Sequence, residues 1–306
     1  LYPSGDPLAV SAVPGDMLVI EYVVPVTSVS KGNVKIIRVG HDYRGIFSEK
    51  KDGQYGQSGS CNVDIMCPEG AGWQIEKRSV CRLITNNIYL GSGALINNAR
   101  KNGLPYLLTA NHVIPDQARA TNTVFYFNYE SPSCGGPDGS VNQTISGSTL
   151  RATKYDNDGK LDFTLVQLSS NPPRDFNPYL AGWNRNPVIS GQVSAIHHPK
   201  GDVKKISRSD ATPSTSTFEE YDQGTHWWIK IWDIGTTEGG SSGSPLFDQN
   251  HYIIGDLSGG QANCTNSVND FYQKFSVSYN AYSSASQQLK AWLDPDNTGI
   301  VTLSGY

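Results

Sequence analysis

Short runs of β-branched and aromatic residues, separated by Gly, Pro, Asn and Asp, dominate this chain, while helical periodicity is almost absent. Such runs predict strands, and the turn residues between them indicate antiparallel sheets in a sandwich or a barrel. One helix is predicted near the C-terminus, where Leu289, Trp292 and Leu293 share a face. The chain is therefore expected to be all-β with a C-terminal helix. The helix is predicted over 284–293, and clear strand runs are 17–24, 34–39, 123–129, 163–168, 226–232 and 252–257.

Length and composition exclude several classes of protein. With 306 residues the chain can form one large domain or two small ones. It has 24 basic and 28 acidic residues, so it lacks the cationic face that nucleic-acid binding requires. No apolar run is long enough to span a bilayer. We expect neither a nucleic-acid nor a membrane partner. The chain starts at Leu1 without a signal-like stretch, which predicts an exported protein whose targeting segment has been removed.

Five cysteines give information about compartment. None lies in a CxxC pair, so a zinc ribbon or a thioredoxin-type site is not expected. Their wide spacing in a weakly charged chain is typical of long-loop disulfides in an exported protein, and two bridges plus one free thiol is the natural count. Five buried thiols in a cytosolic protein are the alternative. The adjacent His197 and His198 do not predict a metal site, because neighbours on a strand point to opposite faces. We predict no metal and no cofactor.

A polar, Gly-rich stretch at 48–60 divides the chain. It carries Lys50 and Lys51 and is typical of an exposed linker. We therefore expect a small β-rich N-terminal segment, residues 1–55 with the linker, followed by a larger domain, residues 56–306.

Three separate sites carry candidate chemistry. Ser242 lies in the run Gly-Gly-Ser-Ser-Gly-Ser-Pro, where a tight turn can expose the hydroxyl and aim backbone N–H groups at one point. His112 ends an apolar strand, and Asp162 lies at the start of another. A serine nucleophile needs an imidazole to take its proton and a carboxylate to orient that imidazole. Each site alone is more often structural, but together and in the order His, Asp, Ser they predict an acyl-transfer centre.

Five motifs in order resemble those of secreted bacterial lysyl endopeptidases, which are serine proteases with the trypsin fold. The resemblance covers residues from about 56 to about 299. It implies a trypsin-like double β-barrel that cleaves polypeptide substrates after Lys, and we expect it to be a monomer. The motifs are SGSCNVDIMCPEG at 58–70, TANH at 109–112, DFTL at 162–165, AIHHP at 195–199 and GSSGSP at 240–245.

The resemblance also implies roles for individual residues. Ser242 would be the nucleophile, His112 the general base and Asp162 its orienting carboxylate. Backbone N–H groups of Gly240 and Ser242 would form the oxyanion hole. The strand Ser258, Gly259 and Gly260 would pair with the substrate backbone. The implied disulfides are Cys61–Cys264 and Cys67–Cys134, which leave Cys81 unpaired.

Specificity for Lys requires a carboxylate at the base of the P1 pocket, because a buried ammonium is costly unless it is paired. At the usual trypsin position, six residues before the nucleophile, this chain has Thr236. In the family that the chain resembles, the acid follows a cysteine beyond the substrate strand, which points to Asp270. The alternative is that Asp270 lies in a surface turn and that the enzyme prefers another P1 residue.

The sequence departs from the family pattern near the predicted site. Gly91 and Val113 replace the cysteine pair that usually closes the loop of the catalytic histidine. Ser258 replaces a histidine of the substrate strand, which puts its usual aromatic stacking in doubt; Phe218 and Tyr221 are only candidates for the aromatic partner. Gln273 replaces a Gly near the pocket and could narrow it.

Activation is also expected to differ from that of trypsin-type zymogens. There a freed N-terminal ammonium pairs with an Asp just before the nucleophile, and here that residue is Ser241. Our hypothesis is that residues 1–55 act as an intramolecular chaperone or inhibitor, released by cleavage after Lys50 or Lys51. Alternatively, they stay attached as a layer of strands.

A protein of another class could share these features. A secreted adhesin or glycan-binding module would use exposed tryptophans as a stacking platform, although such residues more often belong to a core. The candidates are Trp227, Trp228 and Trp232.

Overall fold

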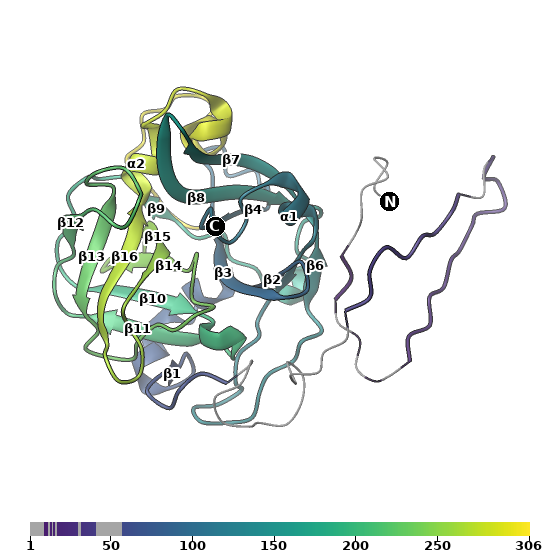
Figure 1. Cartoon of the computed structure of the whole chain (residues 1–306), viewed down its shortest axis with the longest axis horizontal. Coiled ribbons are helices and arrows are strands. Elements are labelled where there is room, and N and C mark those ends of the chain that lie inside the picture. Colours follow the sequence, from purple (N-terminus) through teal and green to yellow (C-terminus); the bar gives the residue numbers. More distant parts are fainter. Residues whose placement is uncertain (1–8, 12, 14, 16, 30–31, 41–56) are drawn as a thin grey trace.

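Two mostly antiparallel sheets form the body of the molecule. The computed structural model describes residues 9–11, 13, 15, 17–29, 32–40 and 57–306. Residues 80–168 supply one sheet, and residues 183–303 supply the other together with a short strand at 63–64. The two sheets lie side by side (Figure 1). The all-β prediction is confirmed.

The first sheet has seven strands in the spatial order β6-β5-β2-β3-β4-β8-β7. Its inward-facing apolar side chains, such as Leu83, Phe125 and Val166, are fully buried in one cluster. This burial explains why β-branched and aromatic residues dominate these segments. The strands are β2 (Val80–Thr85), β3 (Tyr89–Leu95), β4 (Tyr106–Thr109), β5 (Thr123–Tyr126), β6 (Thr144–Ser146), β7 (Ser148–Asp156) and β8 (Gly159–Leu168).

The second sheet has ten strands. Its main order is β1-β11-β10-β14-β15-β16-β13-β12, and β9 pairs with β15 and β17. β1 opens the folded domain but belongs to this later sheet, where Val63 lies opposite Ile206. The strands are β1 (Val63–Asp64), β9 (Trp183–Asn184), β10 (Val193–His197), β11 (Lys205–Ser209), β12 (Ser214–Ser216), β13 (His226–Ile231), β14 (Pro245–Asp248), β15 (Ile253–Gly260), β16 (Val268–Lys274) and β17 (Thr302–Leu303).

One core cluster joins the two sheets. Leu108 and Phe163 from the first sheet are buried with Trp183 and Phe247 from the second. Above this cluster, the backbone N–H of Asp162 on β8 donates to the side chain of Gln273 on β16 (3.0 Å). The strand ends that carry the predicted site residues therefore meet at the junction of the sheets.

Helices are few and short. The predicted C-terminal helix is present but broken: η5 and α3 are separated by Gln288 and Leu289, and the backbone of Gln288 is extended. The extended residue brings the N–H of Leu289 to the carbonyl of Ser278 (3.0 Å), so a tertiary contact replaces part of the expected helix. In the described ranges no helix is long and apolar enough to cross a membrane. The α-helices are α1 (Gln117–Thr121), α2 (Phe275–Asn280) and α3 (Lys290–Leu293), and the 3-10 helices are η1 (Pro68–Trp73), η2 (Glu76–Ser79), η3 (Arg174–Phe176), η4 (Pro199–Gly201) and η5 (Ala285–Gln287).

The N-terminal part of the chain differs from the prediction. Residues 17–24 and 34–39 form no strand, and Met17 and Val19 are 78% and 80% exposed. Figure 1 shows them as extended chain beside the body. A strand needs a neighbour that takes up its N–H and C=O groups, and an apolar run does not supply one. The prediction of a β-rich N-terminal segment is therefore wrong for these residues. Lys50 and Lys51 of the predicted linker lie outside the described residues.

Both implied disulfides are present. Cys61 is bonded to Cys264 and Cys67 to Cys134, and Cys81 is a buried free thiol. The first bond ties the start of the folded domain to the loop after β15.

Candidate active site

His112 and Asp162 form a pair at the junction of the sheets. His112 follows the end of β4, and Asp162 lies on the neighbouring β8. The Nδ1 atom of His112 is 2.9 Å from Oδ2 of Asp162, and the backbone N–H of His112 donates to Oδ1 (3.0 Å). The carboxylate is fully buried, whereas the imidazole is 37% exposed. The pair therefore keeps the proton on Nδ1 and leaves Nε2 free to accept one.

The pKa values of this pair fit a general base. Burial lowers the pKa of His112, but the hydrogen bond and charge of Asp162 outweigh burial and leave that pKa above its usual value. Burial raises the pKa of Asp162, while hydrogen bonds from His112 and Ser258 bring it below its usual value. The carboxylate is thus ionised wherever the imidazole titrates.

The turn that carries Ser242 packs against the end of β4. The carbonyl of Ser242 accepts a hydrogen bond from the N–H of Ser92 (2.8 Å). Gly243 has φ +77°, and a Cβ there would lie 2.1 Å from Oγ1 of Thr109, three residues before His112. Only glycine fits this close approach. Among the described residues no hydrogen bond joins the Ser242 hydroxyl to His112. Such a contact is often long in an unliganded protease.

Two backbone N–H groups of this turn have no acceptor. Across the described residues, neither the N–H of Gly240 nor that of Ser242 donates to another protein group. The carbonyl of Gly239 accepts a hydrogen bond from the N–H of Lys200 (2.6 Å). Because the C=O and N–H of one peptide group point in opposite directions, the N–H of Gly240 points away from Lys200. Unengaged N–H groups at such a turn are what an oxyanion hole requires.

Asp270 lies beneath the predicted substrate strand. It is 1% exposed, and in the register of β15 and β16 it lies opposite Gly260. Its Oδ2 accepts hydrogen bonds from Trp232 Nε1 (2.7 Å) and Thr237 Oγ1 (2.6 Å). A Cβ at Gly260 would lie 2.4 Å from Oδ1, so Oδ1 faces that strand. Burial raises the pKa of Asp270 to about 6 although hydrogen bonds from Thr237, Trp232 and the backbone of Ala262 oppose it.

The end of β15 has an open edge. β14 pairs with β15 only up to Asp256, whereas β16 continues to pair with Gly259 and Gly260. In the described part of the chain, no strand lies on the other side of Ser258–Gly260. A peptide can therefore add there as an extra strand.

Sequence reasoning missed a histidine that supports Asp162. His226 Nε2 is 3.0 Å from the hydroxyl of Ser258, which itself hydrogen-bonds Asp162. Phe218 and Tyr221 lie against the His226 ring at centroid distances of 5.8 and 5.3 Å. The two aromatic candidates thus lie against His226 with their rings tilted at 59° and 45°, and not against position 258. In the sequence, the signal for this role was that His226 is the first residue of a strand and is followed by Trp227 and Trp228.

Three further expectations can be compared with the structure. Gln273 lies on the face of β16 opposite to Asp270, under Asp162, so it does not narrow the pocket. A Cβ at Gly91 would lie 2.6 Å from Val113, which places the two residues side by side where the family has a disulfide. Trp227 and Trp232 are buried and Trp228 is half-buried, so the three tryptophans do not form the exposed platform that the glycan-binding alternative needs.

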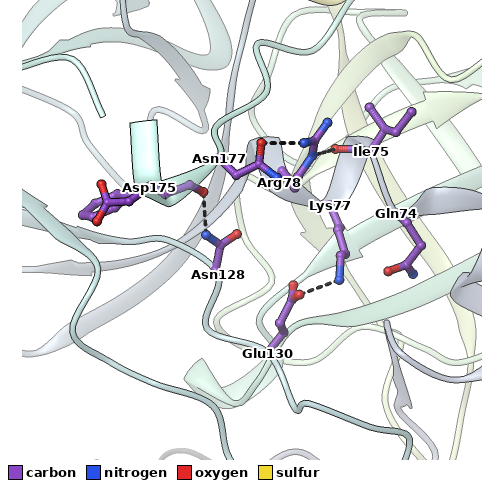
Figure 2. Close-up of a pocket in the computed structure, with 9 residues that line it drawn as sticks. Gln74, Ile75, Lys77, Arg78, Asn128, Glu130, Asp175 and Asn177 are labelled. Carbon is purple, nitrogen blue, oxygen red and sulfur yellow. Dashed lines mark hydrogen bonds and ion pairs between the residues drawn. The ribbon is translucent and has the colours of Figure 1, made fainter. Parts of the chain in front are cut away.

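One hollow lies apart from these residues. Figure 2 shows this pocket of about 470 Å³. Its cationic groups already have partners, since Lys77 contacts Glu130 and Arg78 donates to Asn177. None of the predicted site residues lines it. Within the described residues, no group of three His, Cys, Asp or Glu side chains could hold a metal ion.

The fold and the site together define a trypsin-like serine protease scaffold. Among solved structures, the protease Anisep from Arthrobacter nicotinovorans matches with a TM-score of 0.50 and 18% identity, over 70% of this chain and 93% of that one. The chain belongs to the lysyl endopeptidase family: residues 55–275 match the family described as lysyl endopeptidase, C-terminal domain.

Two curated relatives extend this comparison. Lysyl endopeptidase of Pseudomonas aeruginosa is 29% identical over 289 residues, which are 89% of this chain and 61% of that protein. Secreted RxLR effector protein 73 of Plasmopara viticola is 32% identical over 143 residues, 46% of this chain and 35% of that protein. The chain therefore spans less than two thirds of the length of either relative.

Proposed function

We propose that this protein is a serine endopeptidase that cleaves peptide bonds after Lys. The observation that carries the proposal is the buried Asp162 bonded to an accessible His112 beside a Ser242 turn with two unengaged N–H groups. Ser242 Oγ attacks the peptide carbonyl while its proton moves to His112 Nε2. Collapse of the tetrahedral intermediate breaks the C–N bond, and His112 returns the proton to the leaving amine. Water then hydrolyses the acyl-enzyme by the same steps.

Asp270 supports Lys as the P1 residue. Its Oδ2 is already occupied by Trp232 and Thr237, and only Oδ1 faces the substrate strand. A compact ammonium needs one oxygen, whereas a guanidinium binds best to two. We expect kcat/KM for Lys substrates to exceed that for Arg substrates by at least about tenfold, because Arg would lose one charge-assisted hydrogen bond.

The first prediction is a cleavage map. A denatured protein digested by the full chain and read by mass spectrometry should give fragments that end in Lys. Asp270→Asn should lower kcat/KM for Lys substrates by about a hundredfold to a thousandfold, because a buried cation would lose its partner. Ser242→Ala, the matched control, should lower kcat by about 10⁶. Cleavage by that variant at the wild-type rate would refute the mechanism, and an unchanged P1 preference in Asp270→Asn would refute the specificity.

We further propose that the protein acts outside the cell and that its folded domain is residues 56–306. Both disulfides support export, since they form in oxidising compartments. Ser58 supports the boundary because its N–H and hydroxyl both bond Asp202 (2.9 and 2.6 Å), and Gly59 donates to Glu238 (2.8 Å).

Residues 1–55 are proposed to be a pro-segment. Ala9 is buried in a cluster with Ile84 and Val124 on the first sheet, while most apolar side chains of residues 17–39 are exposed. The second prediction is self-cleavage after Lys50 or Lys51. Purified full chain should lose the segment, as read by N-terminal sequencing, and Ser242→Ala should keep it. Normal maturation of pure Ser242→Ala would show that the cut is not made by the protein itself.

A further inference from the structure

The residue before the proposed nucleophile is anchored to a histidine. Ser241 is fully buried, and its hydroxyl is 2.8 Å from Nδ1 of His197, which ends β10. The same hydroxyl oxygen accepts the backbone N–H of Glu238 (3.2 Å). Ser241 thus occupies the position before the nucleophile with a neutral side chain and a neutral partner.

The other side of the imidazole holds the far end of the same loop. His197 Nε2 is 3.0 Å from the hydroxyl of Ser207, which donates its proton to the carbonyl of Thr236 (2.7 Å). A serine hydroxyl has one proton, so Ser207 must accept from His197 Nε2–H. Burial, with a smaller contribution from Lys205, lowers the pKa of His197 to about 3, so the ring is neutral. Nδ1 therefore carries no proton and accepts a hydrogen bond from the hydroxyl of Ser241.

This assignment satisfies every donor and acceptor and ties both ends of 236–241 to one ring. Between these ends lies Gly240, whose N–H is one of the two oxyanion donors. The segment after His197 adds a second constraint, because Lys200 N–H holds the carbonyl of Gly239 (2.6 Å). Ser92 Oγ adds a third by donating to the carbonyl of Gly240 (3.0 Å). The contacts of Ser241, of the Gly239 and Gly240 carbonyls and of the Thr236 carbonyl are all made with uncharged groups.

We propose that His197 is a positioning residue that fixes the oxyanion turn in its working shape through Ser241 and Ser207. In trypsin-type zymogens the same position holds an Asp whose carboxylate pairs with the new N-terminal ammonium, and Ser241 with His197 replaces that ion pair by neutral hydrogen bonds. The proposal rests on the proposed function. We call the hydrogen bonds that join His197 to Ser241 and Ser207 the clamp. Its loss is expected to weaken binding of the tetrahedral intermediate more than binding of the substrate.

The test compares two serine-to-alanine variants in the full chain. Ser241→Ala removes the hydroxyl that donates to Nδ1 of His197. The value of kcat should fall by about tenfold to a hundredfold, which is less than the loss of a whole oxyanion donor costs, and KM should stay within about threefold of the wild-type value. Affinity for a peptide aldehyde ending in Lys, which forms a tetrahedral adduct, should fall in parallel with kcat. The control is Ser148→Ala on β7, which removes a similarly buried hydroxyl that donates to the carbonyl of Ala120 in α1 (3.0 Å) and should keep wild-type kcat. An unchanged kcat in Ser241→Ala, or a loss confined to KM, would overturn the proposal.

A second measurement does not depend on activity. Nitrogen-15 spectra of the imidazoles at pH 7, with His197 assigned by its loss in His197→Gln, should show a neutral ring with the proton on Nε2. A charged ring or a proton on Nδ1 would refute the clamp. Ser207→Ala removes the acceptor of that proton and serves if Ser241→Ala does not fold; it too should lower kcat more than it raises KM. If the wild type cleaves no substrate, the proposed function fails, while the spectra still show whether His197 holds Ser241 and Ser207 as proposed.

Discussion

At the scale of single residues, the proposed site contains two groups that must lose a proton before Lys substrates are cleaved. His112 has a pKa above its usual value because Asp162 stabilises its charged form, and it acts as a base only when neutral. Asp270 has a pKa of about 6 because it is buried, and it binds an ammonium only when ionised. One group acts on the chemical step and the other on substrate binding.

The third prediction concerns the acid side of the pH profile. As the pH falls, kcat/KM for a Lys substrate should first drop with a slope of one as His112 becomes protonated above pH 6.5. It should then steepen to a slope of two below about pH 6 as Asp270 becomes neutral. Stopped-flow or steady-state assays of an ester substrate measure this profile. Asp270→Asn should show a single slope of one throughout, and a second ionisation retained in that variant would contradict the assignment.

At the scale of elements, neighbouring strands meet where the family has a disulfide. Gly91 lies on β3 and Val113 in the turn after β4, and a Cβ at Gly91 would lie 2.6 Å from Cγ1 of Val113, so the Val113 side chain fills the space beside Gly91. Two cysteine side chains at these positions should therefore come within bonding reach.

The fourth prediction is that Gly91→Cys with Val113→Cys forms a disulfide under oxidising conditions. Closing a loop of this length stabilises by about 3 kcal/mol, which would raise Tm by roughly 5–10 °C. Calorimetry of the oxidised double variant against the oxidised single Val113→Cys variant measures the shift, because both carry the native disulfides. Ser242→Ala as the background prevents self-digestion. An equal Tm in the two variants would show that the two positions cannot be bridged.

The elements also show what the sequence could predict. Ser242, His112 and Asp162 could be predicted as candidates because each lies in a short local motif, and Asp270 because the family resemblance pointed to it. The link from His226 through Ser258 to Asp162 could not, because it depends on which strand lies beside β15 and β16. Residues 17–24 had the right composition for a strand, but composition does not provide a pairing partner.

At the scale of the whole molecule, buried histidines make the fold sensitive to acid. Burial lowers the pKa of His197 to about 3 and of His226 to about 4, and that of His198 also lies well below its usual value. In an unfolded chain these rings accept protons near pH 6.5. Between pH 6.5 and about 4 the unfolded state therefore binds protons that the folded state does not, and stability falls. Asp256 and Asp270, whose pKa values burial raises, oppose this effect.

The fifth prediction is measured by urea unfolding between pH 7 and pH 4 in the Ser242→Ala background. The free energy of unfolding should decrease toward acid pH, and His226→Gln should make the dependence shallower by up to about 1.4 kcal/mol per pH unit, the equivalent of one proton. Identical slopes with and without His226 would show that this ring is not neutral in the folded protein.

The position of β1 and the Cys61–Cys264 bond also governs how the protein can be made. Cys61 is synthesised 203 residues before its partner, and β1 must wait for β11 of the later sheet. At ordinary translation speeds that delay is roughly 10–40 s. The nascent polypeptide therefore cannot complete its final topology until most of it has left the ribosome, and the Cys61–Cys264 bond is the late step that closes the domain.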